Sequence, residues 1–329
     1  SKKLIHCSNL FYNAPQIILA QKLVELSCGD KVFFCNSGAE ANEAAIKLAK
    51  RYINKFDNPK KTVIVSMKNS FHGRTLATVA LTGQEKYHDG YAPLLEGVIY
   101  GIFNDENDLE KILGENVGIL IIEPIQGEGG IRPANKSFLQ KARDLCDERG
   151  IILIFDEVQC GIGRTGKLFA YEQFDVIPDI VSLAKGLGSG FPIGAIVAKK
   201  EVAKGFKPGV HASTFGGNPI STTAAKVVLE TVMKEGFLEN VNETSLKLIE
   251  GLEKLQVKYN KIKDVRGMGL ILAIEFDEPV GRLVTGALEK GLLIINSGSN
   301  VIRFVPALTI GEDEIKELLE ILDNLLSTF

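Results

Sequence analysis

Tryptophan is absent from the sequence, and histidine, methionine and cysteine are scarce, with four, three and five residues respectively. The cysteines form no CxxC pair, so neither a disulfide framework nor a cysteine-rich zinc site is expected, and a reducing, cytoplasmic environment is the natural prediction. The histidines form no HxxxH or HExxH arrangement, so we predict no metal ion. These shortages argue against small secreted and zinc-dependent classes of protein.

The sequence also lacks an excess of one charge and a long hydrophobic run. Its 38 basic and 41 acidic side chains leave a formal net charge of −3, which gives no support for nucleic acid or a membrane surface as a partner. The two longest stretches without Asp, Glu, Lys or Arg, Leu4–Gln21 and Pro208–Ala225, contain Asn, Pro, Ser and His, so neither is expected to span a membrane. What is present is an ordinary globular composition over 329 residues, long enough for two domains.

Short apolar runs alternate with longer amphipathic stretches up to about residue 230. We expect strands at Thr62–Ser66, Val117–Glu123, Gly150–Asp156, Ile180–Ala184 and Ile193–Ala198. Helical patterns fall between them at Ala39–Tyr52 and Ser137–Arg149. Several of the strands are almost wholly apolar, as in a sheet that is covered on both faces. The alternation predicts an α/β fold with a large, mostly parallel sheet over residues 1–230.

The pattern changes after residue 230. Helices are expected at Val241–Tyr259, Arg282–Lys290 and Glu312–Leu326, and strands at Leu270–Phe276 and Val301–Phe304. In the last helix the apolar residues recur with helical spacing on one face. We therefore predict a smaller α+β domain over residues 231–329.

Two of the predicted strands end in side chains that are costly to bury. Asp156 and Glu157 close one apolar run, and Lys185 closes another just before Gly186–Gly190. Ligands gather at the carboxyl ends of strands in open α/β sheets, and desolvation would lower the pKa of the lysine and make it a nucleophile toward a carbonyl. The alternatives are a helix cap or an internal salt bridge for the acids, and a lysine that reaches the surface.

Two further segments carry binding chemistry. Asn36–Glu43 leads into a predicted helix with small residues, and the free N–H groups of a helix start can bind an anion. In Phe71–Thr75, an arginine beside a glycine is suited to a bidentate grip on a carboxylate, and Phe71 is suited to cover a flat ring. A plain capped helix, and a surface arginine with a core phenylalanine, are the alternatives.

A glycine-rich stretch imitates nucleotide-binding motifs. Gly161–Gly166 fits GxGxxG, and Gly161–Lys167 fits GxxxxGK. A dinucleotide site needs a helix that opens at the glycines, and a P-loop needs Ser or Thr after the lysine for magnesium. No clear helix begins at Lys167, and position 168 is Leu. A P-loop-like nucleotide-binding module therefore stays as an alternative from a different class of protein.

Together these groups describe one flat ligand with an anionic tail, a ring nitrogen that an acid can pair with and an aldehyde that a lysine can capture. Pyridoxal phosphate has all of these features. The sequence moreover resembles the class III pyridoxal-phosphate aminotransferases over nearly its whole length. The resemblance rests on the segments Ser37–Asn42, Phe71–Thr75, Glu123–Gly130, Asp156–Lys167, Leu183–Leu187, Ser213–Pro219, Arg266–Leu270 and Ile302–Pro306. It implies the fold type I, aspartate-aminotransferase-like architecture and a homodimer with shared active sites.

The resemblance implies how the ring of the cofactor is held. Lys185 is similar to the Schiff-base lysine of the family, and Asp156 to the partner of the pyridinium nitrogen. Gln159 corresponds to the ligand of the phenolic oxygen. Val158 and Phe71 correspond to the two side chains that enclose the ring.

The resemblance also assigns the phosphate of the cofactor to the start of a helix. Ser37 and the backbone amides of Gly38 and Ala39 are expected to bind it. Thr214 is expected to reach the phosphate in the neighbouring subunit, with Ser213 beside the substrate. These residues make the expected active site depend on two chains.

The substrate side of the site is implied in the same way. Arg74 is expected to bind the α-carboxylate of the substrate. Arg303 is expected to bind a carboxylate of glutamate or 2-oxoglutarate, and to pair with Glu128 when that carboxylate is not there. Family members also carry a further segment before the part that matches Leu4–Tyr12, with aromatic residues that border the substrate pocket, so we expect the natural protein to be longer.

Within the family the sequence is most similar to members that act on N2-acetylornithine. The resemblance thus implies an enzyme of arginine biosynthesis that moves the terminal amino group of N2-acetylornithine to 2-oxoglutarate. The products are N-acetylglutamate 5-semialdehyde and glutamate. Ornithine, succinylornithine, acetyl-lysine and 4-aminobutyrate remain alternative donors, because the enzymes that use them share most of these motifs. A non-catalytic fragment is the remaining alternative.

Overall fold

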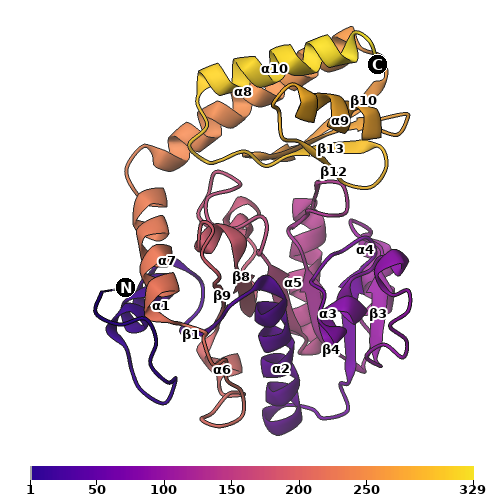
Figure 1. Ribbon diagram of the computed structural model, residues 1–329. Helices are drawn as coiled ribbons and strands as arrows, with labels where there is room; N and C mark the ends of the chain where they lie inside the picture. The colour runs from indigo at the N-terminus through magenta and orange to yellow at the C-terminus, as the bar shows by residue number, and fades with distance from the viewer. Residues whose placement is uncertain (1) are drawn as a thin grey trace.

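The computed structural model describes residues 2–329. Across these residues the main chain forms a seven-stranded and a four-stranded sheet, joined by a helical connection, with a small two-stranded ribbon beside them. Figure 1 shows the smaller sheet and its helices stacked above the larger sheet, with α7 leading upward into α8. No helix in this range is both long and apolar enough to cross a membrane.

The larger sheet has the strand order β1, β9, β8, β7, β4, β2, β3. In that order the strands are Lys31–Cys35, Gly194–Ala198, Ile180–Leu183, Ile152–Asp156, Val117–Ile122, Val63–Met67 and Val98–Gly101. Strands β8, β7, β4, β2 and β3 pair in parallel, and β9 runs antiparallel to both of its neighbours. The predicted mostly parallel α/β architecture is therefore confirmed.

Helices cover both faces of this sheet, and the apolar side chains of the two faces pack in two separate core clusters. Helix α2 (Gly38–Phe56) packs with Ile152 and Ile154 of β7 in one core cluster. Leu153 and Phe155 lie in the other cluster. That second cluster includes residues of α1 (Ala14–Leu26), α5 (Lys136–Arg149) and α7 (Pro219–Val232). Because side chains alternate along a strand, the next residue after Phe155, Asp156, points toward α2.

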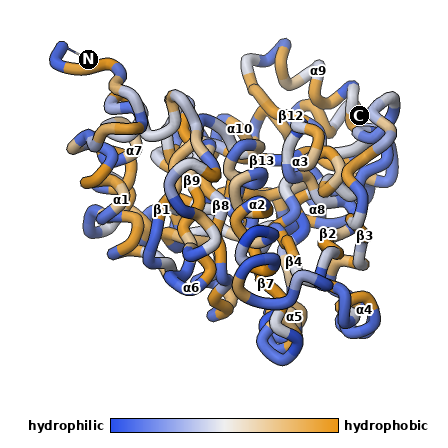
Figure 2. The backbone as a smooth tube through the Cα atoms, turned by 90° about the horizontal axis from the view of Figure 1, so that it is seen from below, coloured by the Kyte–Doolittle hydropathy of each residue, from blue (hydrophilic) through white to orange (hydrophobic). Residues whose placement is uncertain are grey.

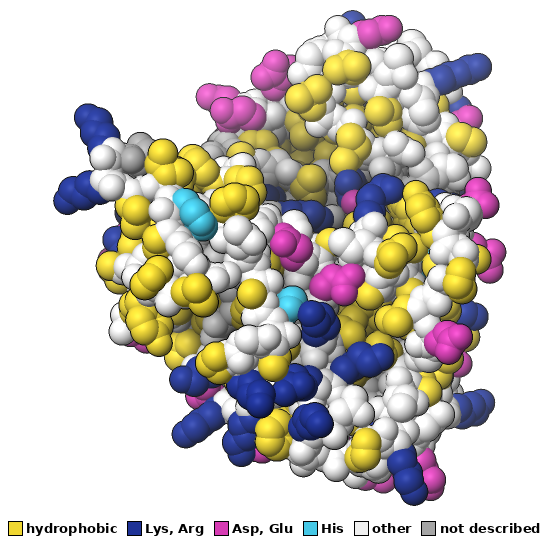
Figure 3. Space-filling model, turned by 60° about the horizontal axis from the view of Figure 1, so that its bottom comes forward, with side chains coloured by type: hydrophobic (Ala, Val, Ile, Leu, Met, Phe, Trp, Pro, Cys, Tyr) yellow, Lys and Arg dark blue, Asp and Glu magenta, His cyan; other side chains and the backbone are white. Residues whose placement is uncertain are grey.

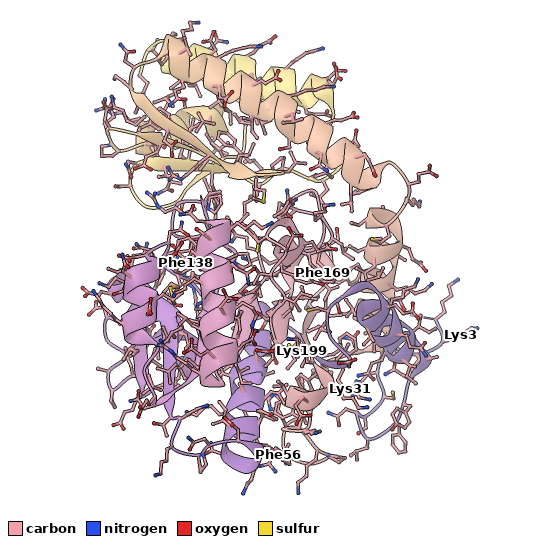
Figure 4. All side chains as sticks on the ribbon, turned by 180° about the vertical axis from the view of Figure 1, so that it is seen from behind. Lys3, Lys31, Phe56, Phe138, Phe169 and Lys199 are labelled. Atoms are coloured by element: carbon pink, nitrogen blue, oxygen red, sulfur yellow. The ribbon has the colours of Figure 1, made fainter. Side chains whose placement is uncertain are left out.

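The phenylalanines around the larger sheet are buried or exposed according to their distance from its core. Phe138 of α5 and Phe169 are fully buried, and Figure 4 places both within the larger part of the molecule. Phe56, by contrast, is exposed at the end of α2, far from the smaller sheet. Figure 2 shows the strands of the large sheet as mostly hydrophobic tube, with hydrophilic segments toward the outside, as expected for a sheet buried on both faces.

The smaller sheet is antiparallel, with the order β10, β11, β13, β12. These strands are Ile262–Met268, Ile271–Phe276, Val301–Phe304 and Ile295–Asn296. Helices α8 (Phe237–Lys258), α9 (Gly281–Glu289) and α10 (Glu312–Leu326) bury their apolar faces against it in a core cluster of its own. The boundary at residue 230 stays a prediction, and α7 extends through it to Val232.

Shorter elements complete the chain. They are α3 (Leu76–Leu81), α4 (Glu106–Ile112), α6 (Lys200–Ala203), the ribbon β5 (Ile125–Gln126) and β6 (Arg132–Pro133), and 3₁₀ turns at Glu85–Tyr87, Ala170–Gln173 and Lys185–Leu187. The predicted strands and helices are all present, with small differences at their ends. Strands β1, β3 and β10 were not among the predictions, and neither were helices α1 and α7.

Candidate active site

A cavity of about 510 Å³ opens at the carboxyl ends of β7 and β8, beside the start of α2. Most of the residues predicted to bind the cofactor line it, together with Arg74, which was predicted to bind the substrate: Ser37, Gly38, Ala39, Phe71, Arg74, Asp156, Val158, Gln159 and Lys185. A larger cavity of about 1630 Å³ shares Gln159 and Lys185 with the first and adds Glu128 and Arg303. The structure therefore gathers residues from distant segments around two joined cavities.

The start of α2 forms one wall of the smaller cavity. Ser37 caps the helix, because its side chain accepts a hydrogen bond from the Glu40 amide at 3.2 Å. A Cβ atom on Gly38 would lie 2.6 Å from Val158 Cγ1, so a larger residue cannot fit there. The first amides of a helix have no partner within it, and they lie at the positive end of the helix dipole. Gly38 and Ala39, at the start of α2, line this wall of the cavity, and anion binding there stays a prediction.

Asp156 lies at the floor of the cavity and is almost completely buried. Its Oδ2 atom accepts hydrogen bonds from Asn42 Nδ2 at 2.6 Å and His72 Nδ1 at 2.8 Å. Its Oδ1 atom accepts one from the Val158 amide at 3.0 Å. Three donors thus stabilise a carboxylate that would otherwise be costly to bury. The sequence did not single out Asn42 or His72 as site residues. The only signal for them is that they lie within the segments Ser37–Asn42 and Phe71–Thr75.

Glu123, at the end of β4, is a second buried acid that the sequence analysis missed as an individual residue. Its carboxylate accepts hydrogen bonds from the Phe71 amide at 2.9 Å and the Gly127 amide at 3.2 Å. Burial raises the pKa of Glu123 to about 7, because a low-dielectric surrounding disfavours the charged form. The contact with the amide of Phe71 fixes the main chain that presents the phenylalanine to the cavity.

Glu157 has a structural role, unlike Asp156 beside it. Its two carboxylate oxygens each accept a backbone hydrogen bond of 2.7 Å, from Ala170 and Tyr171. These bonds hold the 3₁₀ turn that follows the glycine-rich stretch. Burial raises the pKa of Glu157 to about 8, against the opposing effect of the two amide donors. Of the two acids at the end of β7, Asp156 therefore faces the cavity and Glu157 stabilises the fold.

This raised pKa predicts how stability depends on pH. A carboxyl group with a higher pKa in the folded protein than in the unfolded chain binds more protons when folded, so its contribution to stability is present at low pH and lost as pH rises. Between about pH 4.5 and 8, the free energy of unfolding of the Glu157→Gln variant should fall less steeply with pH than that of the wild type. Urea titrations at several pH values measure this, with the exposed Glu253→Gln as control. A steeper fall in the Glu157→Gln variant would contradict it.

Lys185 follows β8 and lies where the two cavities meet. Its φ of +40° places a non-glycine residue in the left-handed region, a strained conformation that clusters at functional sites. The prediction that this lysine is desolvated is wrong for the chain described here, because Lys185 is exposed. The physical reason is that both neighbouring cavities open at its side chain, so the end of a buried strand does not bury the residue that follows it.

Arg74 reaches the smaller cavity from the loop between β2 and α3. Gly73 before it has a φ of +139°, and a Cβ atom there would lie 2.8 Å from Ala39 Cβ, so only glycine lets this loop approach the start of α2. The guanidinium carbon of Arg74 lies 5.0 Å from the ring centre of Tyr87 and 5.7 Å from that of Phe71. These aromatic contacts orient an exposed arginine.

Arg303, in β13 of the smaller sheet, forms an ion pair of 2.5 Å with Glu128. Its guanidinium also lies 3.5 Å from Gln159 Oε1. The main chain of Glu128 is fixed separately, because Ser297 Oγ donates a hydrogen bond of 2.8 Å to the Glu128 carbonyl. The larger cavity thus holds an arginine whose charge is already paired by a carboxylate of the same chain.

Two residues that were predicted to belong to the active site, Ser213 and Thr214, do not line either cavity. The Ser213 hydroxyl accepts a hydrogen bond of 3.0 Å from Asn36 Nδ2, which places it next to the smaller cavity. Thr214 is exposed and lines neither cavity. His6 and Phe215 contact each other with ring centres 5.0 Å apart, so this loop lies beside the amino-terminal segment.

The glycine-rich stretch Gly161–Lys167 is a series of turns and not a phosphate-binding loop. A 3₁₀ turn at Ala170–Gln173 follows it where a nucleotide site needs a helix. Arg164 donates hydrogen bonds to the carbonyl groups of Leu270 at 2.9 Å and Pro306 at 2.5 Å. The stretch therefore links the larger part of the chain to the smaller one, and the nucleotide-binding alternative is not supported.

A lysine, a buried carboxylate and a helix start lie around one cavity on this mixed α/β fold, which is the arrangement expected of a pyridoxal-phosphate-dependent transaminase of fold type I. The chain matches the aminotransferase class-III family over residues 1–326 and belongs to it. It is accordingly a pyridoxal-phosphate-dependent transaminase, as the sequence predicted.

Individual relatives agree with this assignment. The chain is 53% identical over 328 residues to the acetylornithine aminotransferase of Caldanaerobacter subterraneus subsp. tengcongensis, covering 99% of this chain and 83% of that protein. It is 48% identical to the acetylornithine aminotransferase of Methanocaldococcus jannaschii, covering 99% and 82%. The solved N-acetylornithine aminotransferase from Stenotrophomonas maltophilia K279a superposes with a TM-score of 0.87 at 38% identity, covering 100% and 83%. The ornithine aminotransferase from Toxoplasma gondii ME49 superposes with a TM-score of 0.95 at 30% identity, covering 99% and 80%.

Proposed function

We propose that this enzyme transfers the terminal amino group of N2-acetylornithine to 2-oxoglutarate, giving N-acetylglutamate 5-semialdehyde and glutamate, as a step of arginine biosynthesis. The observation that carries the proposal is the identity of 53% with an acetylornithine aminotransferase over almost the whole chain. The two arginines support it, because Arg74 suits the single carboxylate of the donor and Arg303 suits the second carboxylate of 2-oxoglutarate.

The residues around the smaller cavity fit pyridoxal phosphate. The amides at the start of α2 suit its phosphate, and the buried carboxylate of Asp156 suits a protonated ring nitrogen. We assign Gln159 to its phenolic oxygen, and Val158 and Phe71 to the two faces of its ring. When bound, the cofactor supplies an aldehyde for amines and a ring that accepts electrons.

In the proposed reaction Lys185 holds the cofactor through its Nζ atom and then acts as the general base. Its Nζ takes the proton from the amine-bearing carbon of the donor. The exposed position of Lys185 between the two cavities lets its side chain turn toward either a bound cofactor or a bound substrate. Asp156 would stay paired with the ring nitrogen throughout.

The ion pair of Arg303 with Glu128 suits an enzyme that must bind two different substrates in turn. With N2-acetylornithine, whose reacting terminal carbon carries no carboxylate, the pair stays closed and no unpaired guanidinium faces the alkyl chain of the donor. With 2-oxoglutarate, the carboxylate next to the reacting carbonyl carbon takes the place of Glu128 on Arg303, which lies beside Gln159. Glu128 thus balances the charge of Arg303 in the half-reaction in which no substrate carboxylate does so.

The Arg74→Lys variant tests the grip on the donor. A lysine ammonium cannot reproduce the planar fork of arginine, so the KM for N2-acetylornithine should rise about tenfold while kcat changes little. Steady-state kinetics measure this, and 1,4-diaminobutane, a donor without a carboxylate, should show no such rise. The exposed Arg282→Lys serves as control. An unchanged KM for N2-acetylornithine would give Arg74 a structural role only.

We infer that the active enzyme is a homodimer. The amino-terminal segment exposes Leu10, Phe11 and Tyr12, and Phe215 beside Thr214 is exposed as well. In the view of Figure 3, hydrophobic side chains gather at the left of the molecule. An exposed hydrophobic patch of this kind is typical of a protein interface. A second chain on this surface would bring Thr214 to the phosphate of its neighbour. The mass of the cofactor-loaded enzyme in solution tests the dimer.

A panel of amine donors tests the substrate. The purified enzyme, loaded with pyridoxal phosphate and supplied with 2-oxoglutarate, should give its highest kcat/KM with N2-acetylornithine. Ornithine, succinylornithine, acetyl-lysine and 4-aminobutyrate are the competing donors. A higher kcat/KM with any of these would overturn the proposed donor, and failure with all of them would overturn the proposed reaction.

A further inference from the structure

Asn42 lies where three parts of the active site meet. It belongs to an early turn of α2 and is 1% exposed. Its Nδ2 atom donates to Asp156 Oδ2 at 2.6 Å and to the His72 carbonyl at 2.8 Å. Its Oδ1 atom accepts from Ser182 Oγ at 2.6 Å. The amide orientation is unambiguous, because the reverse one would set Oδ1 against two acceptor oxygens.

The sheet register explains why one side chain reaches all these groups. Asp156 and Ser182 lie directly opposite each other on the neighbouring parallel strands β7 and β8. Ile154 and Ile180, two residues earlier on these strands, pack in the core cluster that contains α2. Because side chains alternate, Asp156 and Ser182 also face α2, and Asn42 bridges them.

We propose that Asn42 is a positioning residue that fixes the Asp156 carboxylate relative to the start of α2 and to Lys185. This inference rests on the proposed function. One rigid helix carries the amides of Gly38 and Ala39 in its first turn and the carboxamide that holds Asp156 in the next. The span from the phosphate to the ring nitrogen of pyridoxal phosphate is set by its covalent structure, and α2 sets the matching span in the protein.

Asparagine suits this task because it is a neutral donor. A lysine or arginine at this position would neutralise Asp156, and an aspartate would place a second carboxylate against it. Asn42 orients the carboxylate and leaves its charge available to the cofactor. Ser182 in turn holds Asn42, and it belongs to β8, the strand that Lys185 follows.

The test compares two ligands on the apo-enzyme: pyridoxal phosphate and 1-deazapyridoxal phosphate, its analogue with carbon in place of the ring nitrogen. Hydrogen bonds to charged groups are the strong ones, so the Kd of Asn42→Ala for pyridoxal phosphate should rise about 10- to 100-fold. Its Kd for the analogue should change less than about threefold, because that ligand makes no bond to Asp156. Equilibrium dialysis measures both values.

Controls separate this role from a general loss of structure. Ser245→Ala removes a buried hydroxyl that donates to the Gly269 carbonyl at 2.7 Å in the smaller part of the chain, and it should leave both Kd values unchanged. If Asn42→Ala does not fold, Ser182→Ala makes the same comparison with a smaller rise. An equal rise for both ligands, or none, would overturn the positioning role. A wild type that binds neither ligand would instead overturn the proposed function.

Discussion

The Lys185→Ala variant is expected to lose turnover by a factor of about 10⁴ or more, because it removes both the covalent attachment of the cofactor and the base at the reacting carbon. Borohydride treatment of the wild-type holoenzyme, followed by mass spectrometry, should place the mass of the cofactor on the peptide that contains Lys185. The same treatment of the variant should leave the protein unlabelled. Cofactor held only by contacts should still bind, since the start of α2 and Asp156 remain.

Lys199→Ala is the matched control for this experiment. Lys199 lies just beyond β9, forms an ion pair of 2.9 Å with Asp179 and lines neither cavity of the site. Its loss should leave kcat and the labelled peptide unchanged. Label on a peptide other than that of Lys185, or turnover that survives in Lys185→Ala, would remove Lys185 from the mechanism.

Asp156→Asn is expected to keep the cofactor and lose most of its activity. At an effective dielectric constant near 20, opposite charges about 4 Å apart attract by about 4 kcal/mol, which corresponds to about three units of the pKa of the ring nitrogen. Without that charge the nitrogen loses its proton at neutral pH, and kcat should fall about 10³-fold. Steady-state kinetics and the cofactor content of the purified variant measure the two effects.

The structure also shows how the asparagine of this variant must sit. Asn42 and His72 both donate to Oδ2 of residue 156, so the new amide oxygen has to take that position. Its NH₂ group then faces the Val158 amide, another donor, and this adds local strain without removing the cofactor. The exposed Asp175→Asn is the control. A near-normal kcat in Asp156→Asn with full cofactor content would refute the electronic role of Asp156.

Part of the fold and of the active site could be predicted from the sequence, because local patterns of apolar and polar residues determine it. The apolar run before Asp156 has strand length and no polar break, so the strand, its burial on both faces and the acid at its end follow from local pattern. Strands β1 and β3 were missed because they are short and partly exposed at the two edges of the sheet. An edge strand is defined by its partner and not by its own hydrophobicity.

The exposure of Lys185 shows the limit of prediction from local sequence patterns. A lysine at the end of an apolar strand predicts a desolvated amine, yet the structure exposes it. Exposure depends on how the loops and the smaller sheet close around the strand end, and no pattern within one segment contains that information. The partners of Asp156 were missed for the same reason, since Asn42 and His72 come from separate segments.

By itself the sequence determined the family, the sheet and the residue types of the site, because periodicity and motifs are local properties of the chain. Tertiary structure alone decided which of these residues meet. The parallel register of β7 and β8 turned Asp156 and Ser182 to the same face, and the close approach of α2 placed Asn42 between them. Hydrogen-bond partners distant in sequence depend on the packing of whole elements, and that packing is settled only when the core forms.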